Sequence, residues 1–169
     1  MGMRLRAKMG LATLLLGWLA CAAPLRAQPA ACPVQKPSVD SATVALRQGD
    51  FSKAFELYFL AARNHPGDVQ AIAGQIRSLL QEGQISEASQ LAESSVAENS
   101  TSAALVTAMG EVRLRQGRLS EAAEAYETSL NLDPCLARTR YDWYQLLWIE
   151  SMRASGYEQL KRAYQLDPD

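Results

Sequence analysis

The sequence predicts an all-α fold, a solenoid of antiparallel helix pairs, and three observations support this prediction. Four kinds of residue recur at intervals of 34 positions without a gap. The apolar residues between them follow helical spacing, as at Phe51, Phe55 and Tyr58. No stretch of any length alternates between apolar and polar residues as a strand does.

The recurring residues each have a role in a helix pair. They are Gly49, Gly83 and Gly117; Ser52, Ser86 and Ser120; Ala54, Ala88 and Ala122; and Pro66, Ser100, Pro134 and Pro168. Each glycine is expected to end the first helix of a pair, because glycine readily adopts the positive φ of a helix C-cap. Each serine is expected to cap the second helix, and each alanine to lie where two helices approach closely. Each proline is expected to end the second helix.

These positions resemble the tetratricopeptide repeat, whose second helix carries Ala, an aromatic residue, Ala and Pro. The matching residues are Ala54, Tyr58, Ala61 and Pro66; Ile72, Leu79, Ala88 and Ala92; and Met109, Gly110, Ala122, Tyr126 and Pro134. The resemblance implies a right-handed superhelical solenoid of about four units, at residues 35–68, 69–102, 103–136 and 137–169. The last unit has Ser151 at the glycine position and Gly156 at the alanine position, so its turn is expected to shift toward residues 153–156.

Residues 1–27 have the layout of a secretory signal peptide, with a basic start, a short apolar run and a small-residue exit. We predict cleavage after Ala27, with Ala22 and Ala23 as alternatives, then a flexible leader at residues 28–34 and the solenoid at 35–169. An uncleaved membrane anchor is the alternative, although a membrane span needs about 20 apolar residues and this run is shorter. The chain is therefore expected to be exported, and to be periplasmic or secreted.

The cysteines leave further possibilities open. Cys21 follows Leu19 and Ala20, which resembles the lipobox of bacterial lipoproteins, although Trp18 departs from that pattern. Only lipidation of Cys21 would make a membrane a partner of this chain. Export makes a disulfide between Cys32 and Cys135 chemically possible, but the repeat geometry is expected to separate them. We therefore expect two unpaired thiols, or a bond from Cys32 to another chain.

The charge of the chain after residue 27 argues against polyanionic partners. Residues 28–169 contain 13 Lys and Arg against 18 Asp and Glu, a net charge of −5. A negative charge of this size repels nucleic acid and anionic lipid. We therefore expect no nucleic acid among the partners.

Residues that could support catalysis or bind a metal or cofactor are sparse. The one histidine, His65, is expected to be a polar turn residue, because nucleophile–base systems pair a histidine with two further groups. Metal sites need clustered ligands, and the phosphate-binding patterns GxGxxG and GxxxxGK are both absent. We predict no enzyme activity, no cofactor and no metal.

The resemblance implies a binding surface on the concave face, lined by the first helix of each unit. The positions chosen as partner contacts are Arg77, Glu111, Tyr141, Gln145 and Trp148. One subfamily grips a C-terminal carboxylate with Lys and Asn, but Val39 and Thr43 stand at those positions, so that clamp is absent. Arg77 could bind an anion or pair with a neighbouring glutamate.

Aromatic residues are concentrated in the last unit. Six of the 11 aromatic residues after position 27 lie between Tyr141 and Tyr164. Exposed aromatic clusters are typical of binding hot spots. The alternative is that these residues form the core of a terminal unit.

Together these features predict a non-catalytic protein-interaction or scaffold module of the bacterial periplasm or envelope, which binds a partner peptide or helix in its concave groove. One alternative is the N-terminal region of a longer secreted enzyme, such as an aspartyl-protease-like hydrolase. Another is an outer-membrane lipoprotein scaffold. No capping helix follows Pro168, so the last unit could also pair with its twin in a homodimer.

Overall fold

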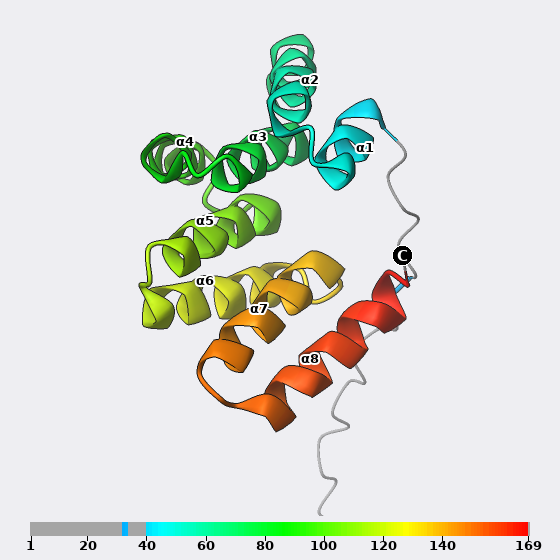
Figure 1. Ribbon diagram of the computed structural model, residues 1–169, viewed down its shortest axis with the longest axis vertical. Coiled ribbons are helices and arrows are strands. Elements are labelled where there is room, and N and C mark those ends of the chain that lie inside the picture. Colours follow the sequence, from blue (N-terminus) through cyan, green and yellow to red (C-terminus); the bar gives the residue numbers. More distant parts are fainter. Residues whose placement is uncertain (1–31, 34–39, 169) are drawn as a thin grey trace, which may run out of the picture. The chain divides into compact units, whose positions relative to one another are not determined.

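The computed structural model describes residues 32–33 and 40–168, which form eight α-helices and no strand (Figure 1). The helices are α1 (Ser41–Gln48), α2 (Phe51–Asn64), α3 (Val69–Gln81), α4 (Ile85–Glu98), α5 (Ala103–Arg115), α6 (Leu119–Leu132), α7 (Ala137–Ile149) and α8 (Arg153–Leu166). The predicted signal peptide, with Cys21 and Ala27, lies outside the described residues, as does most of the leader.

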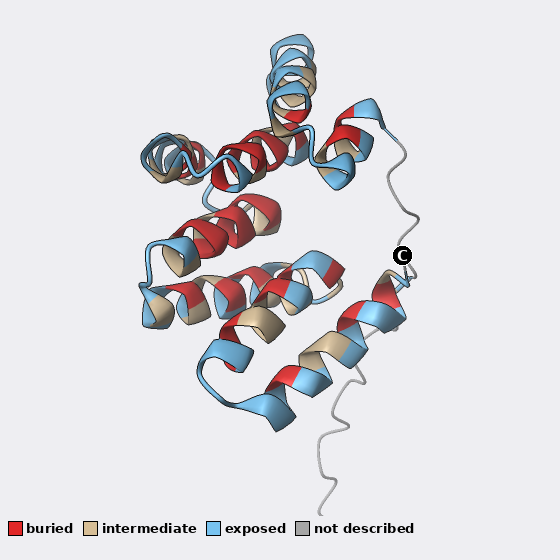
Figure 2. Ribbon diagram, viewed as in Figure 1, coloured by how far each residue is buried: buried red, intermediate tan, exposed pale blue. Residues whose placement is uncertain are grey.

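Consecutive helices pack as antiparallel pairs, and the pairs stack on one another (Figure 1). Each first helix also contacts the first helix of the next pair, so α1, α3, α5 and α7 form one layer. Most buried residues lie in the first helices of the pairs. They are numerous in α3 and α5 and few in α2 and α8 (Figure 2). The prediction of an all-α solenoid of helix pairs is confirmed.

The turn inside each pair is built in the same way. Gly49, Gly83 and Gly117 have φ angles of 81°, 79° and 76°, which confirms that each ends the first helix of its pair. The residue that follows the glycine serves two helices at once. The N–H of Asp50, for example, donates to the carbonyl of Ala45 in α1 at 3.0 Å, while Asp50 is also the N-cap of α2.

This tight turn makes the predicted serine caps wrong. Ser52, Ser86 and Ser120 are the second residues of α2, α4 and α6. The N-cap positions belong to Asp50, Gln84 and Arg118. Because a single residue links the glycine to the next helix, that helix has already begun when the chain reaches the serine.

The last pair keeps the same turn without a glycine, so the predicted shift toward residues 153–156 is wrong as well. Ser151 takes the glycine position with a φ of 61°, and α8 begins at Arg153. The N–H of Met152 donates to the Leu147 carbonyl at 2.8 Å, as the equivalent residue does in the other turns. A left-handed conformation costs a non-glycine residue about 1–2 kcal/mol. The packing of α8 on α7 therefore holds Ser151 in this conformation.

The residues five positions after each turn lie where two helices cross. Ala54, Ala88 and Ala122 are fully buried, as predicted. Gly156 is buried at the equivalent place, and a Cβ there would lie 3.5 Å from Leu147, an ordinary contact.

Gly110, within α5, has no such room, because a Cβ on it would lie 2.5 Å from the ring of Tyr126, which is itself buried. Alanine therefore fits at Gly156 and does not fit at Gly110.

Gly156→Ala is expected to stabilise the protein by about 0.5–1 kcal/mol, because alanine loses less backbone entropy than glycine in a helix. Gly110→Ala is the matched comparison and is expected to destabilise it by about 1–3 kcal/mol, because the Tyr126 ring would have to move. The urea midpoints of the two variants and the wild type measure both effects. Two shifts of the same sign would contradict the packing at one of the two glycines.

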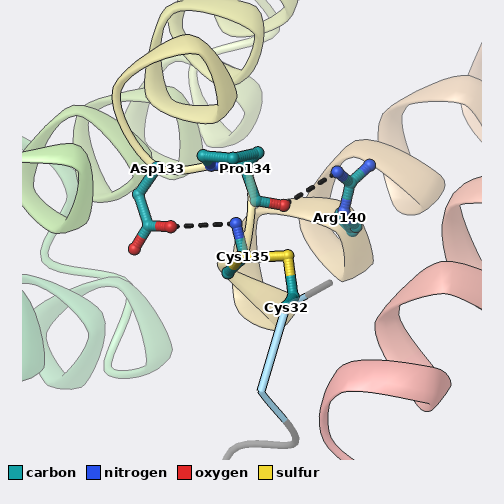
Figure 3. Close-up of a disulfide and its surroundings, with 5 residues drawn as sticks. All are labelled: Cys32, Asp133, Pro134, Cys135 and Arg140. Carbon is teal, nitrogen blue, oxygen red and sulfur yellow. Dashed lines mark hydrogen bonds between the residues drawn. A yellow bond between two sulfur atoms is a disulfide. The ribbon is translucent and has the colours of Figure 1, made fainter. Parts of the chain in front are cut away.

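A disulfide joins Cys32 to Cys135, so the prediction of two unpaired thiols is wrong (Figure 3). The repeat geometry separates helices, but Cys32 belongs to the leader and not to a helix. Eight residues lead from Cys32 to Asp40, the N-cap of α1, and an extended segment of that length reaches at most about 29 Å. The helix spacing that separates the pairs therefore does not fix the position of Cys32.

That joint is held on both sides of the disulfide (Figure 3). The N–H of Cys135 donates to Asp133 Oδ1 at 2.9 Å. The guanidinium of Arg140 donates to the Pro134 carbonyl at 2.9 Å and to Gln159 of α8 at 3.0 Å. The disulfide thus anchors the leader to a joint that is already tied to α7 and α8.

Candidate functional site

Several hollows open on the layer formed by α1, α3, α5 and α7. One of about 340 Å³ is lined by residues of α1, α3 and α7, among them Arg47, Arg77 and Arg138, and by Phe51 at the start of α2. Another of about 410 Å³ lies between α3, α5 and α7. The first and last pairs can line one hollow only if this layer curves toward itself, so it is the concave face.

Two arginines and two acids form a cluster on this face. Glu111 of α5 accepts hydrogen bonds from Arg77 Nε of α3 at 2.8 Å and from Arg138 Nη2 of α7 at 3.3 Å. Arg138 Nε also donates to Asp142 Oδ2 at 2.9 Å. The side chains of Glu111 and Asp142 are 9% and 4% exposed, against 15% and 44% for Arg77 and Arg138. The acids are buried beneath guanidinium groups that solvent can still reach.

The two acids hold their protons differently. Burial alone would raise the pKa of Glu111, but the charges of Arg138 and Arg77 outweigh it and keep that pKa below its usual value. Burial, and then the charge of Glu111, raise the pKa of Asp142 well above its usual value although Arg138 binds it. Glu111 therefore loses its proton at a lower pH than Asp142 does.

The cluster continues into a smaller hollow of about 70 Å³. Glu111, Asp142, Tyr126 and Gln145 all line it, together with Arg138. The Tyr126 hydroxyl is buried and has no hydrogen-bond partner within the described part of the chain. Burial raises the pKa of Tyr126 far above its usual value, so this hydroxyl stays neutral. Gln145, predicted as a contact, thus lies beside Glu111.

Tyr141 and Trp148 lie on an aromatic row along α7. The ring centres of Tyr141 and Tyr144 are 6.1 Å apart, and those of Tyr144 and Trp148 are 5.9 Å apart. Tyr141 is 44% exposed and Trp148 is 52% exposed, so neither belongs to the core. Tyr141 also lines a hollow of about 370 Å³ with Tyr164 of α8.

The structure thus brings Arg77, Glu111 and Gln145 together around Arg138, while Tyr141 and Trp148 follow the row on α7. Arg77 and Glu111 lie 34 residues apart, so repeat spacing places them side by side on α3 and α5. Sequence reasoning missed Arg138 and Asp142. Arg138 follows Glu111 by 27 residues, which is seven residues, or two helical turns, less than the 34-residue period. The two residues therefore do not occupy equivalent positions in their repeats, and the period does not predict their contact.

The described residues were also compared with the other sites that the sequence suggested. His65 is the exposed residue that ends α2, as predicted for a polar turn residue. Within residues 32–33 and 40–168, no three His, Cys, Asp or Glu side chains are placed to hold a metal ion. In the same part of the chain, no helix has both the length and the apolar character needed to cross a membrane. Val39, one of the two clamp positions, lies outside the described residues.

Comparison with known proteins agrees with the repeat pattern. The family model for the tetratricopeptide repeat matches residues 79–135, and no curated protein matches the chain. A thermophilic TPR protein of Thermus thermophilus superposes with a TM-score of 0.63 at 18% identity, over 74% of this chain and 70% of that one. MamA (41 to its end) of Desulfovibrio magneticus RS-1 superposes with a TM-score of 0.52 at 18% identity, over 74% of this chain and 71% of that one. The chain therefore has the tetratricopeptide-repeat fold, and residues 79–135 carry the sequence pattern of that family.

Proposed function

We propose that this chain is a non-catalytic protein-interaction module that binds a segment of a partner protein on its concave face. One observation carries the proposal: Arg77 lines three hollows, of about 340, 410 and 530 Å³, which together involve residues from all four helix pairs. Because these hollows adjoin one another at Arg77, together they can hold an extended peptide segment better than a compact small molecule. The guanidinium groups of Arg77 and Arg138 are already held by Glu111 and Asp142, so these two side chains lose little freedom on binding.

A photo-reactive residue placed in the groove tests this proposal. Gln81 lines the hollow of about 340 Å³ and is exposed, so it tolerates replacement. Glu127, exposed on the outer helix α6, is the matched control position. We expect a discrete protein cross-linked in the native cells from position 81 and not from position 127. Identical cross-linking from both positions, or none from either, contradicts groove binding.

We propose further that the chain works after export, in an oxidising compartment. The Cys32–Cys135 disulfide supports this, because disulfides persist outside the reducing cytosol. The basic and apolar sequence of residues 1–27 supports it independently. The intact mass of the native protein is the test, and we expect residues 28–169 with one disulfide. A chain that begins at a lipidated Cys21 would identify an anchored lipoprotein instead, and one that retains residues 1–27 contradicts processing.

Trp148→Ala is expected to weaken partner binding more than folding. Half of this side chain is exposed, and truncation of surface residues usually changes stability by about 0.5 kcal/mol or less, whereas hot-spot truncation weakens binding by about 2 kcal/mol or more. The dissociation constant for the cross-linked partner and the thermal midpoint measure the two effects. Tyr157→Ala, on an exposed residue of α8, is the control. A midpoint that falls as far as the affinity would assign Trp148 to the core.

A further inference from the structure

Three arginines from different helix pairs line one part of the concave face. Arg47 at the end of α1, Arg77 in α3 and Arg138 in α7 all border the hollow of about 340 Å³. Arg77 and Arg138 also border the hollow of about 410 Å³, where the polar side chains of Gln70, Thr107 and Thr139 join them. Positive charge from three pairs is thus brought to one place.

These arginines have hydrogen-bond donors that the described part of the protein leaves unused. A guanidinium group has five N–H donors, and toward the described residues Arg77 uses only its Nε, which donates to Glu111. Arg138 uses Nε and Nη2, for Asp142 and Glu111, and its Nη1 has no hydrogen bond to the described residues. Arg47 makes no ion pair with any residue in the described ranges.

The groups that face this hollow carry a net positive charge. Glu111 and Asp142 are the acids in contact with the arginines. Even with both acids ionised, these two negative charges are outnumbered by the three arginines that line the hollow. The remainder of the chain is acidic, since residues 28–169 carry a net charge of −5. The basic hollow is thus local and opposite in sign to the chain as a whole.

The charge distribution favours one class of partner. Glu111 binds the Nε edge of Arg77 and leaves the Nη groups to bind an anion, and a carboxylate matches such a fork with two parallel hydrogen bonds. A nucleic acid would bring many phosphates close to an acidic protein, which is unfavourable. A peptide brings one or two carboxylates and little other charge.

Resting on the proposed function, we propose that the partner segment carries a carboxylate that binds Arg77, with Arg47 and Arg138 beside it. The carboxylate belongs to an Asp or Glu side chain or to a free C-terminus. Glu111 is a positioning residue, because it holds the Arg77 guanidinium and does not contact the partner.

Three short peptides separate the two sources of the carboxylate. One has internal glutamates and a blocked C-terminus, the second has glutamines in their place and a blocked C-terminus, and the third has the glutamines and a free C-terminus. They are titrated into the disulfide-bonded protein, and the Nε–H NMR signals of its arginines report binding at Arg77 directly. We expect a carboxylate peptide to bind at least about tenfold more tightly than the blocked glutamine peptide, since hydrogen bonds to charged groups are the strong ones. Added salt should weaken this binding.

Two substitutions and a control locate the effect. Arg77→Gln is expected to remove the tenfold preference, and Arg47→Gln to reduce it. Arg47 has no ion pair in the described part of the chain, so its variant keeps the test decisive if the loss of Arg77 harms folding. Arg63→Gln, on the outer helix α2, is the control and should change nothing.

Each contrary result has a distinct meaning. Equal binding of all three peptides overturns the carboxylate proposal and leaves the interaction module intact. A single-stranded oligonucleotide that binds more tightly than any peptide, or a preference unchanged in both arginine variants, also overturns it. If no peptide binds, carboxylate recognition is wrong, and cross-linking from position 81 decides separately whether the groove binds a partner.

Discussion

Loss of the Cys32–Cys135 disulfide is expected to lower the free energy of unfolding by about 4–5 kcal/mol, because the bond closes a loop of 103 residues in the unfolded chain. Helix contacts in the described part of the chain join only the same or neighbouring pairs. The disulfide is therefore also a link between distant parts of the array. Urea unfolding with and without dithiothreitol measures the effect as a shift in midpoint. The dependence of the free energy of unfolding on urea concentration should become steeper on reduction, because the unfolded chain becomes more expanded.

The double variant Cys32→Ser/Cys135→Ser is the matched control. It should unfold at the midpoint of the reduced wild type and should not respond to dithiothreitol. The single variant Cys32→Ser should behave in the same way, since Cys135 has then lost the partner with which it forms the disulfide. Equal midpoints for the oxidised and reduced wild type would show that the leader is not tied to the α6–α7 joint.

Substitutions of the two acids in the concave cluster are expected to have opposite effects on stability. Glu111→Ala should cost about 3–5 kcal/mol, because it leaves the largely buried Arg77 without a counter-charge. Asp142→Asn should be neutral or stabilising at pH 7, because the amide oxygen still accepts from Arg138 and no buried charge remains. Glu121→Gln is the control, since the Glu121 side chain that pairs with Arg118 and Arg113 is itself exposed, and such pairs are worth about 1 kcal/mol or less. Urea midpoints at pH 7 measure all three.

The pH dependence separates the two acids. The pKa of Glu111 is lowered in the fold, so its contribution is present above the unfolded pKa of about 4.3 and is lost as the pH falls through the folded value. The pKa of Asp142 is raised, so its contribution is greatest below the unfolded pKa of about 3.9 and is lost as the pH rises through the folded value. The advantage of Asp142→Asn over the wild type should therefore grow from acid to neutral pH. An advantage that is constant with pH would contradict the raised pKa.

The positions of the turns could be predicted because their causes are local. Glycine tolerates a positive φ, and Gly49, Gly83 and Gly117 adopt it where the 34-residue period places them. The serine caps could not be predicted correctly, because the number of linking residues depends on how closely the paired helices pack. Ser151 shows the same limit, since packing holds a turn that its own side chain disfavours.

The candidate site could be predicted only in part. Arg77 and Glu111 occupy the same place in successive repeats, so their contact follows from the period. Arg138 contacts Glu111 although it lies two helical turns before the equivalent position in its own repeat. This contact depends on the curvature of the solenoid, which brings α7 toward α3. The exposure of Trp148 and Tyr141 likewise depends on which side of α7 the neighbouring helices cover.

The repeat, the helix content and the order of the pairs follow from the sequence, because periodic apolar residues and glycine turns act over a few residues at a time. The raised pKa of Asp142, the contact of Arg138 with Glu111 and the disulfide between Cys32 and Cys135 depend on the tertiary structure. Those features join residues that no local pattern relates. They depend on burial and on the path of the chain, which exist only after the pairs have stacked.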